Sequence, residues 1–356
     1  MLEIAIYLAL LNTTKELSGD FLNYCEDYLL ANSFSLQSFL LFKDKEPVFY
    51  FFMWLFSSIS DGNWPIFVFF FTLVNYWVVF EALLIIAKRI NVLCSDLVVI
   101  IVFYAFFFQN FAMISNAVRQ CISQSFALLF FAYLYFEKKR KWFLAIISVF
   151  IHSASIPILA VGMIPVINNR FSIKRLFVVV AVTLVSALFI FKISAFDSIP
   201  FIGYIFSRLD NEDQLTGADS WQVNEGISSQ YLIMLFFLVC MILFYYRKMW
   251  RENENYDYGL LNISAILIIA LLFWHFSGAF FLCMRYQFYL YTLQIVPILM
   301  AYQKINCSVK SYMRPLISIS LPVYFYYYLG NGFYKYITCT DAMLWPVLRY
   351  ICEWHL

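Results

Sequence analysis

Charged residues are scarce in this chain. They make up 13% of its 356 residues, whereas a soluble domain carries about 25%. Glycine is also scarce, and no Gly-rich linker or internal repeat divides the chain into parts. Apolar residues reach 63% and the mean hydropathy is +0.76. This composition excludes a soluble globule and indicates one multi-pass membrane domain over residues 1–356.

The sequence also lacks the motifs that hold common cofactors. Its eight cysteines show no CxxC or Cys/His ligand spacing, so we expect no metal site. The sequence neither supports nor excludes a disulfide between Cys25 and Cys339. No nucleotide-binding motif is present, which argues against a nucleotide-sugar enzyme, and the net charge of +2 indicates no nucleic acid partner. We therefore expect no cofactor.

The chain contains instead a series of long apolar runs. A helix needs about 20 apolar residues to cross a bilayer, and roughly nine or ten runs approach that length. The runs are continuously apolar, unlike the alternating strands of a barrel. We predict an all-α polytopic membrane protein with about 10–12 transmembrane helices, some re-entrant or broken. The clearest spans are about 65–87, 92–111, 117–136, 173–196, 229–246, 258–280, 283–301 and 315–330.

The opening segment, MLEIAIYLALLN, lacks the basic region and cleavage site of a secretory signal. It is therefore either an uncut first helix or a helix whose true start is missing.

Most of the Lys and Arg residues fall in five short clusters between the apolar runs, and such clusters mark cytoplasmic loops. The clusters are Lys88-Arg89, Lys138 to Lys141, Arg170/Lys174/Arg175, Arg247/Lys248/Arg251 and Lys304/Lys310/Arg314. This assignment leaves large external loops at about 13–64 and 197–228, with short external turns near 111–117 and 281–283. The acidic composition of 197–228 agrees with it.

Two apolar segments do not fit a simple alternation of spans. We expect 46–60, only 15 residues long, to dip into or lie on the outer leaflet. The run 142–167 lies between two basic clusters and is too short for two crossings. Because Pro157 would break a helix there, we predict a re-entrant, broken helix with His152 near its middle. The alternative, an external Arg170 cluster, would spoil the sidedness of every later cluster.

Isolated polar and charged side chains mark the predicted outer face. They are Asp20, Tyr24, Glu46, Asn116, Arg119, Gln120, His152, Arg208, His275 and Arg285. Helical spacing places Asn116, Gln120 and Gln124 on one stripe. An ionisable group at a membrane edge is costly and is a functional candidate. Arginine binds phosphate or pyrophosphate through paired N–H bonds, and a carboxylate or imidazole can activate a hydroxyl. The set predicts glycosyl transfer from a lipid pyrophosphate donor.

Structural roles remain open for several of these residues. Arg119 and Arg285 could extend to lipid phosphates. Asp20 could cap a helix, and Glu46 could cap the short helix that Pro47 begins. His275 could be a hydrogen-bonded packing residue.

Six motifs in order carry a resemblance to a known family. Their positions are Gly19, Asp20, Tyr24, Lys43/Lys45, Glu46, Pro47, Asn116, Arg119, Gln120, Phe150, His152, Ser153, Arg285 and Tyr286. Over about residues 15–300, the chain resembles the EpsG-like family. Its members include Wzy-type O-antigen and exopolysaccharide polymerases of bacterial inner membranes.

The resemblance implies a polymerase for O-antigen or another surface polysaccharide, as in lipopolysaccharide biosynthesis. The reaction would transfer a glycan from undecaprenyl pyrophosphate to a lipid-linked repeat unit at the periplasmic face, with a chain-length regulator protein as a further partner. The layout also looks like that of GT-C glycosyltransferases, and by that analogy Asp20 is the base and Glu46 a second acid.

We expect the pyrophosphate to lie on Arg119 and Arg285, and His152 to position the acceptor or transfer a proton. Further substrate contacts are expected from Gln120, Asn116, Tyr24, Arg208 and His275.

Three other classes compete with the polymerase. A flippase or transporter of lipid-linked oligosaccharide would also need external basic groups, but transporters commonly show repeats and midplane sites. A membrane O-acyltransferase would need acyl-donor chemistry from the cytoplasmic side, where the loops are short and basic. A structural subunit would not need Asp20, Arg119, His152 and Arg285 together.

Overall fold

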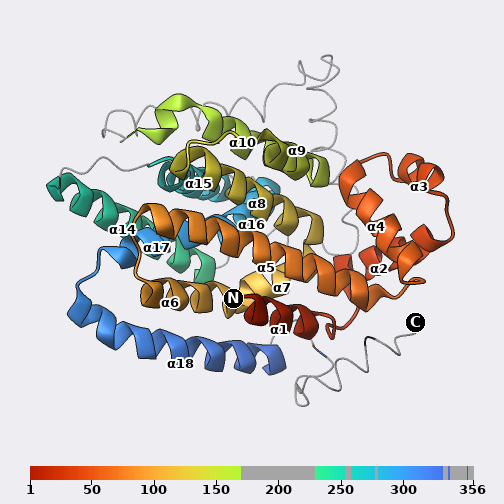
Figure 1. The fold of residues 1–356 in the computed structure, drawn as a ribbon, viewed down its shortest axis with the longest axis horizontal. Helices are drawn as coiled ribbons and strands as arrows, with labels where there is room; N and C mark the ends of the chain where they lie inside the picture. The colour runs from red at the N-terminus through yellow and green to blue at the C-terminus, as the bar shows by residue number, and fades with distance from the viewer. Residues whose placement is uncertain (170–228, 253–257, 277–279, 332–335, 337–350, 352–356) are drawn as a thin grey trace.

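The computed structural model describes residues 1–169, 229–252, 258–276, 280–331, 336 and 351. Within these ranges the regular structure is helical, and an isolated antiparallel bridge between Lys15 and Tyr336 is the β-type contact. The predicted all-α class is confirmed. Most helices run side by side in a bundle, and α2–α4 lie at one end of it (Figure 1).

The bundle contains helices of very different lengths. In chain order they are α1 (Leu2–Asn12), α5 (Trp64–Arg89), α6 (Cys94–Ala105), α7 (Phe108–Asn116), α8 (Val118–Phe131), α9 (Trp142–Ile151), α10 (Ile156–Met163), α14 (Ser229–Glu252), α15 (Gly259–Phe276), α16 (Phe280–Leu293), α17 (Ile295–Gln303) and α18 (Cys307–Asn331). In the described ranges, α5, α14 and α15 each contain a stretch long and apolar enough to cross a membrane. The chain is therefore membrane-embedded.

Two of the predicted spans are interrupted in the structure. The span 92–111 is a bent pair, α6 and α7, with an angle of 52° between them. The span 283–301 breaks at Gln294, between α16 and α17. Pro297 explains the second break, because proline has no N–H to donate to the carbonyl of Leu293. The predicted span 173–196 lies outside the described residues.

The predicted external loop 13–64 is mostly helical. Its helices are α2 (Gly19–Asn32), α3 (Leu36–Lys43) and α4 (Pro47–Ile59), which together we call the outer cap. On α2, Phe21, Tyr24 and Tyr28 recur at helical spacing and are buried together. They form a separate aromatic core with Phe49 of α4 and Trp64 of α5. This core attaches the outer cap to the bundle.

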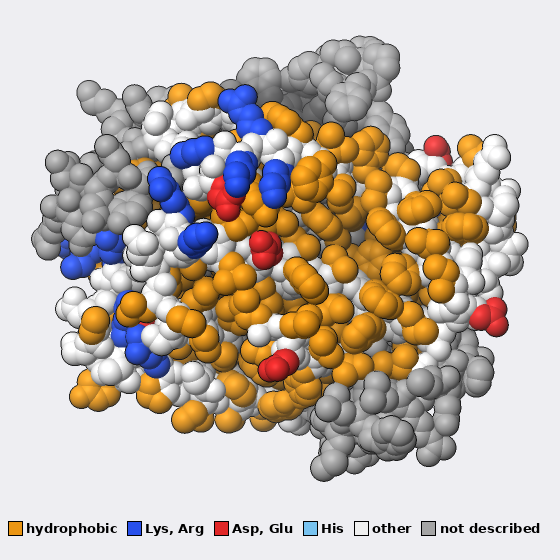
Figure 2. Space-filling model, in the orientation of Figure 1, with side chains coloured by type: hydrophobic (Ala, Val, Ile, Leu, Met, Phe, Trp, Pro, Cys, Tyr) orange, Lys and Arg blue, Asp and Glu red, His pale blue; other side chains and the backbone are white. Residues whose placement is uncertain are grey.

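The basic clusters lie away from the outer cap. On the face of the molecule drawn in Figure 2, the Lys and Arg side chains gather toward the end opposite the outer cap. Lys88 and Arg89 end α5, whose first residue, Trp64, belongs to the aromatic core beneath the cap. We call the two ends of the bundle the outer end and the basic end. The cluster around Arg170 lies outside the described residues.

The segment 142–167 contains the predicted break. Helix α9 ends at Ile151, His152 is extended, and a short 3₁₀ turn leads into α10, with Pro157 in its first turn. The segment begins after the basic turn Lys138–Lys141, and Asn168 beyond its far end accepts a hydrogen bond from Gly259 at the start of α15. The broken-helix prediction is confirmed, with His152 at the break.

Candidate functional site

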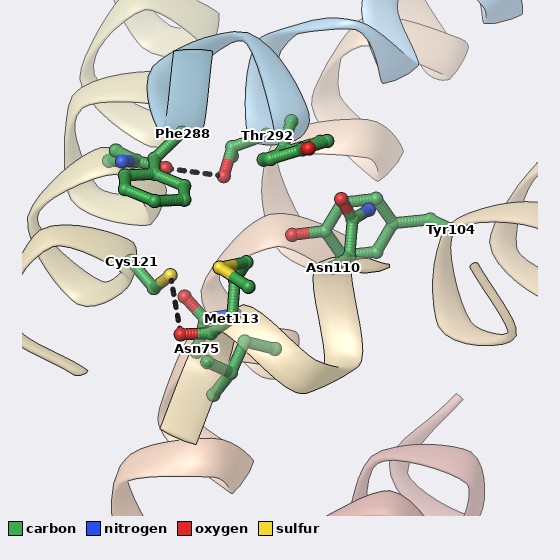
Figure 3. Close-up of a pocket in the computed structure, with 10 residues that line it drawn as sticks. Asn75, Tyr104, Asn110, Met113, Cys121, Phe288 and Thr292 are labelled. Carbon is green, nitrogen blue, oxygen red and sulfur yellow. Dashed lines mark hydrogen bonds between the residues drawn. The ribbon is translucent and has the colours of Figure 1, made fainter. Parts of the chain in front are cut away.

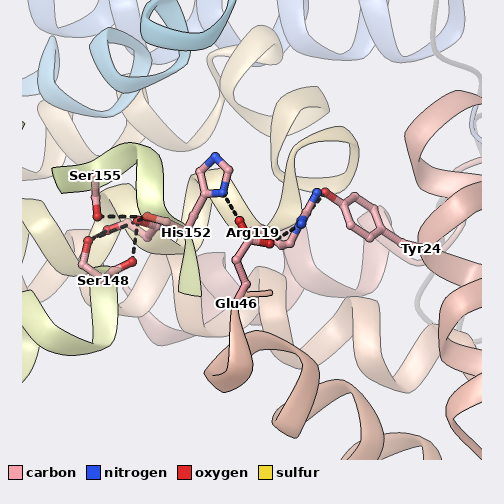
Figure 4. Close-up of polar contacts among 7 residues, drawn as sticks. Tyr24, Glu46, Arg119, Ser148, His152 and Ser155 are labelled. Carbon is pink, nitrogen blue, oxygen red and sulfur yellow. Dashed lines mark hydrogen bonds and ion pairs between the residues drawn. The ribbon is translucent and has the colours of Figure 1, made fainter. Parts of the chain in front are cut away.

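The carboxylate of Glu46 lies at the centre of a polar group where α2, α4, α8 and α9 meet (Figure 4). One carboxylate oxygen, Oε2, accepts a hydrogen bond from Nη1 of Arg119, and Oε1 lies 2.5 Å from Nδ1 of His152. Nε of Arg119 donates to the hydroxyl of Tyr24 at 3.0 Å. We call Tyr24, Glu46, Arg119 and His152 the outer quartet. All four are among the residues predicted from sequence.

Glu46 owes its position to an unusual backbone conformation. It occupies the N-cap of α4 with φ 49° and ψ 57°, immediately before Pro47. A non-glycine residue in this left-handed region costs on the order of 1–3 kcal/mol and is common at functional sites. Its side chain makes no capping bond to α4 and bonds Arg119 and His152 instead. Glu46 therefore holds the N-cap position that the capping alternative assigned to it, while its side chain bonds groups of other helices.

Arg119 is held by protein groups on several sides. Besides Glu46 and Tyr24, its guanidinium lies 5.4 Å from the centre of the Tyr24 ring and 6.0 Å from those of Phe49 and Tyr50. Aromatic faces attract a cation at such distances. The side chain is 21% exposed. These contacts favour a built site over an extended contact with lipid.

Electrostatics keep Glu46 ionised. Burial alone would raise its pKa, but the hydrogen bond with His152 and the charge of Arg119 outweigh burial and lower the pKa to about 2. An ionised carboxylate only accepts hydrogen bonds, so Nδ1 of His152 must carry a proton. In the neutral imidazole, Nε2 is then the nitrogen with the lone pair that can accept a proton. Glu46 thus orients His152 and fixes which ring nitrogen carries the proton.

Hydroxyl groups hold the break that presents His152. Ser123 Oγ of α8 donates to the carbonyl of Ser148 at 2.9 Å, and Ser148 Oγ donates to the carbonyl of Ser123 at 2.8 Å. Ser155 Oγ donates to the carbonyl of His152 at 3.0 Å. The end of a helix leaves backbone carbonyls without helical partners. Ser123 and Ser148 thereby fasten α9 to α8, and Ser155 bonds the carbonyl at the break itself.

A known protein family matches nearly the whole chain. The model of the EpsG family matches residues 2–339, which include all four residues of the outer quartet. The chain belongs to the EpsG family. Membership indicates a glycosyltransferase-like role in polysaccharide biosynthesis. Comparisons with curated proteins and with solved structures found no match.

A buried lysine lies beside the quartet of this EpsG-family protein. Lys15, 1% exposed, donates to Oδ1 of Asn116 and lies 5.0 Å from the centre of the Phe21 ring. Burial lowers the pKa of Lys15 to about 7, against the opposing effect of the negative charge of Asp20. Lys15 was not among the predicted residues, although a lone lysine directly after an apolar helix marks a functional candidate.

Asp20 lies in the first turn of α2, one helical turn before Tyr24. Ser18 is the N-cap of this helix, so Asp20 does not hold the N-cap position that the capping alternative assigned to it. Asn116 ends α7, three residues before Arg119. These two residues therefore border the outer quartet.

The hydrogen bonds given above for the outer quartet do not involve the other predicted site residues. Gln120 is buried on α8. His275 is in the last turn of α15, with its ring 5.2 Å from that of Phe276. Arg285 belongs to α16, but its side chain lies outside the described part, as does Arg208 entirely. Among the described residues, no group of three or more His, Cys, Asp or Glu could hold a metal ion.

Proposed function

We propose that this EpsG-family protein polymerises undecaprenyl-pyrophosphate-linked oligosaccharide repeat units. The product is an O-antigen or a related surface polysaccharide, and the site faces the periplasm from the bacterial inner membrane. The observation that carries the proposal is the outer quartet. It joins an arginine, an ionised carboxylate and a histidine from distant segments, at the end away from the basic clusters.

Arg119 is the pyrophosphate ligand in this proposal. A guanidinium has five N–H donors, and Tyr24 and Glu46 engage Nε and Nη1. The remaining N–H groups suit the oxygens of a pyrophosphate, which arginine binds in pairs. Arg285 is the second predicted cation for this group. Together they stabilise the charge that develops on the leaving pyrophosphate.

His152 is the proton acceptor. The hydroxyl of the acceptor sugar attacks the anomeric carbon of the donor glycan, and a new C–O bond forms. The bond from that carbon to the pyrophosphate breaks, and undecaprenyl pyrophosphate leaves with the electron pair. The hydroxyl proton passes to Nε2 of His152, and the charge of Glu46 stabilises the imidazolium. Asp20, exposed on α2, is the alternative base.

Glycan gels from a strain with the gene deleted test the function. We expect deletion to leave lipid A core with a single repeat unit, and the wild-type gene to restore the ladder of long chains. Arg119→Ala should reach the membrane without restoring the ladder. Arg140→Ala is the matched control, because Arg140 is exposed in the basic turn after α8.

The same gel separates the alternatives. Loss of even the single repeat unit on deletion would mean that the protein acts earlier, as a flippase of the lipid-linked oligosaccharide. A full ladder from Arg119→Ala would end its assignment to pyrophosphate. His152→Gln compared with Asp20→Asn then distinguishes the two candidate bases, because only the true base is needed for long chains.

A further inference from the structure

A second group of polar side chains lines a small cavity between helices of the bundle (Figure 3). The cavity, of about 10 Å³, lies between five helices. These polar side chains are Asn75 of α5, Tyr104 of α6, Asn110 of α7, Cys121 and Gln124 of α8, and Tyr291 and Thr292 of α16. Cys121 and Gln124 follow Arg119 on α8, so the cavity lies along the same helix as the outer quartet.

Two asparagines on the wall have unsatisfied amides. Asn75 is 1% exposed and Asn110 is 4% exposed. In each, neither the amide oxygen nor the amide nitrogen has a partner that meets the geometry of a hydrogen bond, which holds for no other buried amide in the described part of the chain. Gln124 and Thr292, by contrast, bond each other at 3.0 Å. A buried amide without partners costs several kcal/mol in an apolar environment, so these four atoms require an occupant.

The chemistry of the wall selects the occupant. Among the described residues, no Asp, Glu, Lys or Arg lines the cavity, so an ion would bring an uncompensated charge into a medium of low dielectric constant. An apolar molecule would leave the amides unpaired. The space accepts a water-sized molecule but is too tight for a sugar ring. Water both donates and accepts, and buried waters typically make about three hydrogen bonds to such groups.

We propose that this cavity is a water-binding site, in which ordered water hydrogen-bonds the amides of Asn75 and Asn110. The bend between α6 and α7 supports the assignment independently. Tyr104 precedes the break and Asn110 follows it, and the two helices meet at 52°. A broken helix at membrane depth is tolerated where it is buried in protein or lines a water-filled cavity. The proposal does not depend on glycosyl transfer.

Radiolytic labelling of the purified full-length protein tests the site. Hydroxyl radicals formed from bound water oxidise the side chains beside it, so Cys121 should be oxidised several-fold faster than Cys283. Both thiols are buried and donate to a backbone carbonyl, but only Cys121 lines the cavity. Tyr104 against Tyr245 is a second matched pair, since both rings are buried and Tyr245 does not line the cavity. Equal rates within both pairs would overturn the proposal.

A double variant, Asn75→Leu with Asn110→Leu, removes the amides and should exclude the water. We expect the rate for Cys121 to fall to that of Cys283 in this variant. A rate that stays high in the correctly folded variant would also overturn the assignment. The wild-type comparison needs no substitution, so it decides the question even if the double variant does not fold.

Discussion

Each end of the bundle holds a buried carboxylate between two basic side chains, but the two groups differ in their partners. At the basic end, Asp96 of α6 is 1% exposed and accepts hydrogen bonds from Lys310 at 2.8 Å and Arg314 at 2.7 Å, both of α18. We call these three residues the inner cluster. At the outer end, Glu46 pairs with Arg119 and His152.

The inner cluster and the outer quartet differ in their capacity to transfer a proton or bind a ligand. In the inner cluster, the hydrogen bonds from Lys310 and Arg314 to Asp96 fasten α18 to α6. In the outer quartet one partner is a histidine, which gains or loses a proton near neutral pH, and the arginine keeps N–H groups for a ligand. Similar ion pairing therefore joins helices at both ends, and at the outer end it also involves the groups that the proposed reaction would use.

The largest expected effect is on glycan synthesis. Glu46→Gln removes the charge that orients His152, and we expect long chains to fall by about 100-fold or more, the lower range for an acid–base group. Gel analysis of the surface glycan measures this, with Glu26→Gln, an exposed position on α2, as the control. If Glu46→Gln gives a wild-type ladder of glycan chains at wild-type protein abundance in the membrane, then the Glu46 pair has no role in synthesis and resembles the inner cluster.

The inner cluster should fail in stability instead. Asp96→Asn leaves Lys310 buried without its carboxylate, and breaking a buried pair costs about 3–5 kcal/mol. Unfolding of the purified protein in detergent measures the loss, with the exposed Glu3→Gln as control. The glycan chains that the Asp96→Asn protein makes should keep the wild-type length distribution when equal amounts of protein are compared. Shortened chains at equal protein amounts would give the inner cluster a role in the reaction.

Acid should weaken the outer quartet in a defined pH range. The pKa of Glu46 is lowered from 4.5 to about 2 in the folded protein. Its contribution to stability is therefore complete above pH 4.5 and is lost as the pH falls towards 2. The shift corresponds to about 3 kcal/mol. Unfolding measured between pH 5 and 2 should show a steeper loss for wild type than for Glu46→Gln. Parallel curves would contradict the assigned pairing.

The smallest effect is expected from Tyr24→Phe. This change keeps the ring beside Arg119 and removes the hydroxyl that accepts from Nε at 3.0 Å. A hydrogen bond to a charged group contributes about 1.5 kcal/mol or somewhat more, so polymer should fall by about tenfold in a timed synthesis assay. Tyr28→Phe is the control, since its hydroxyl bonds Ser60 away from the quartet. Equal losses in both variants would indicate a packing effect.

Some local features were predictable because their causes lie close together in the chain. Pro157 and the polar residues before it interrupt an apolar run, and the helix breaks at His152 as expected. The bend between α6 and α7 was not predicted, because the break at Phe106-Phe107 contains neither glycine nor proline. Of the outer cap, the sequence predicts the short helix that begins at Pro47, which is α4 in the structure. Helices α2 and α3 fall in the predicted external loop because they are short and mixed with polar residues.

The site itself was predicted as a set of residues and not as a set of contacts. Glu46 is 73 residues from Arg119 and 106 from His152 in the chain, so no local pattern shows that one carboxylate bonds both. Lys15 was missed for the same reason, since only the packing of α1 against α7 places it beside Asn116.

Sequence alone determined the membrane class, the separation of the two ends and the residues worth testing. Hydrophobic length and clustered basic charge are local properties, and each can be read within about 20 residues. Tertiary structure alone decided which carboxylate orients the histidine, which lysines are buried and where two asparagines share a cavity. Those outcomes depend on how helices distant in the chain pack, because burial and hydrogen-bond partners exist only once the helices are in contact.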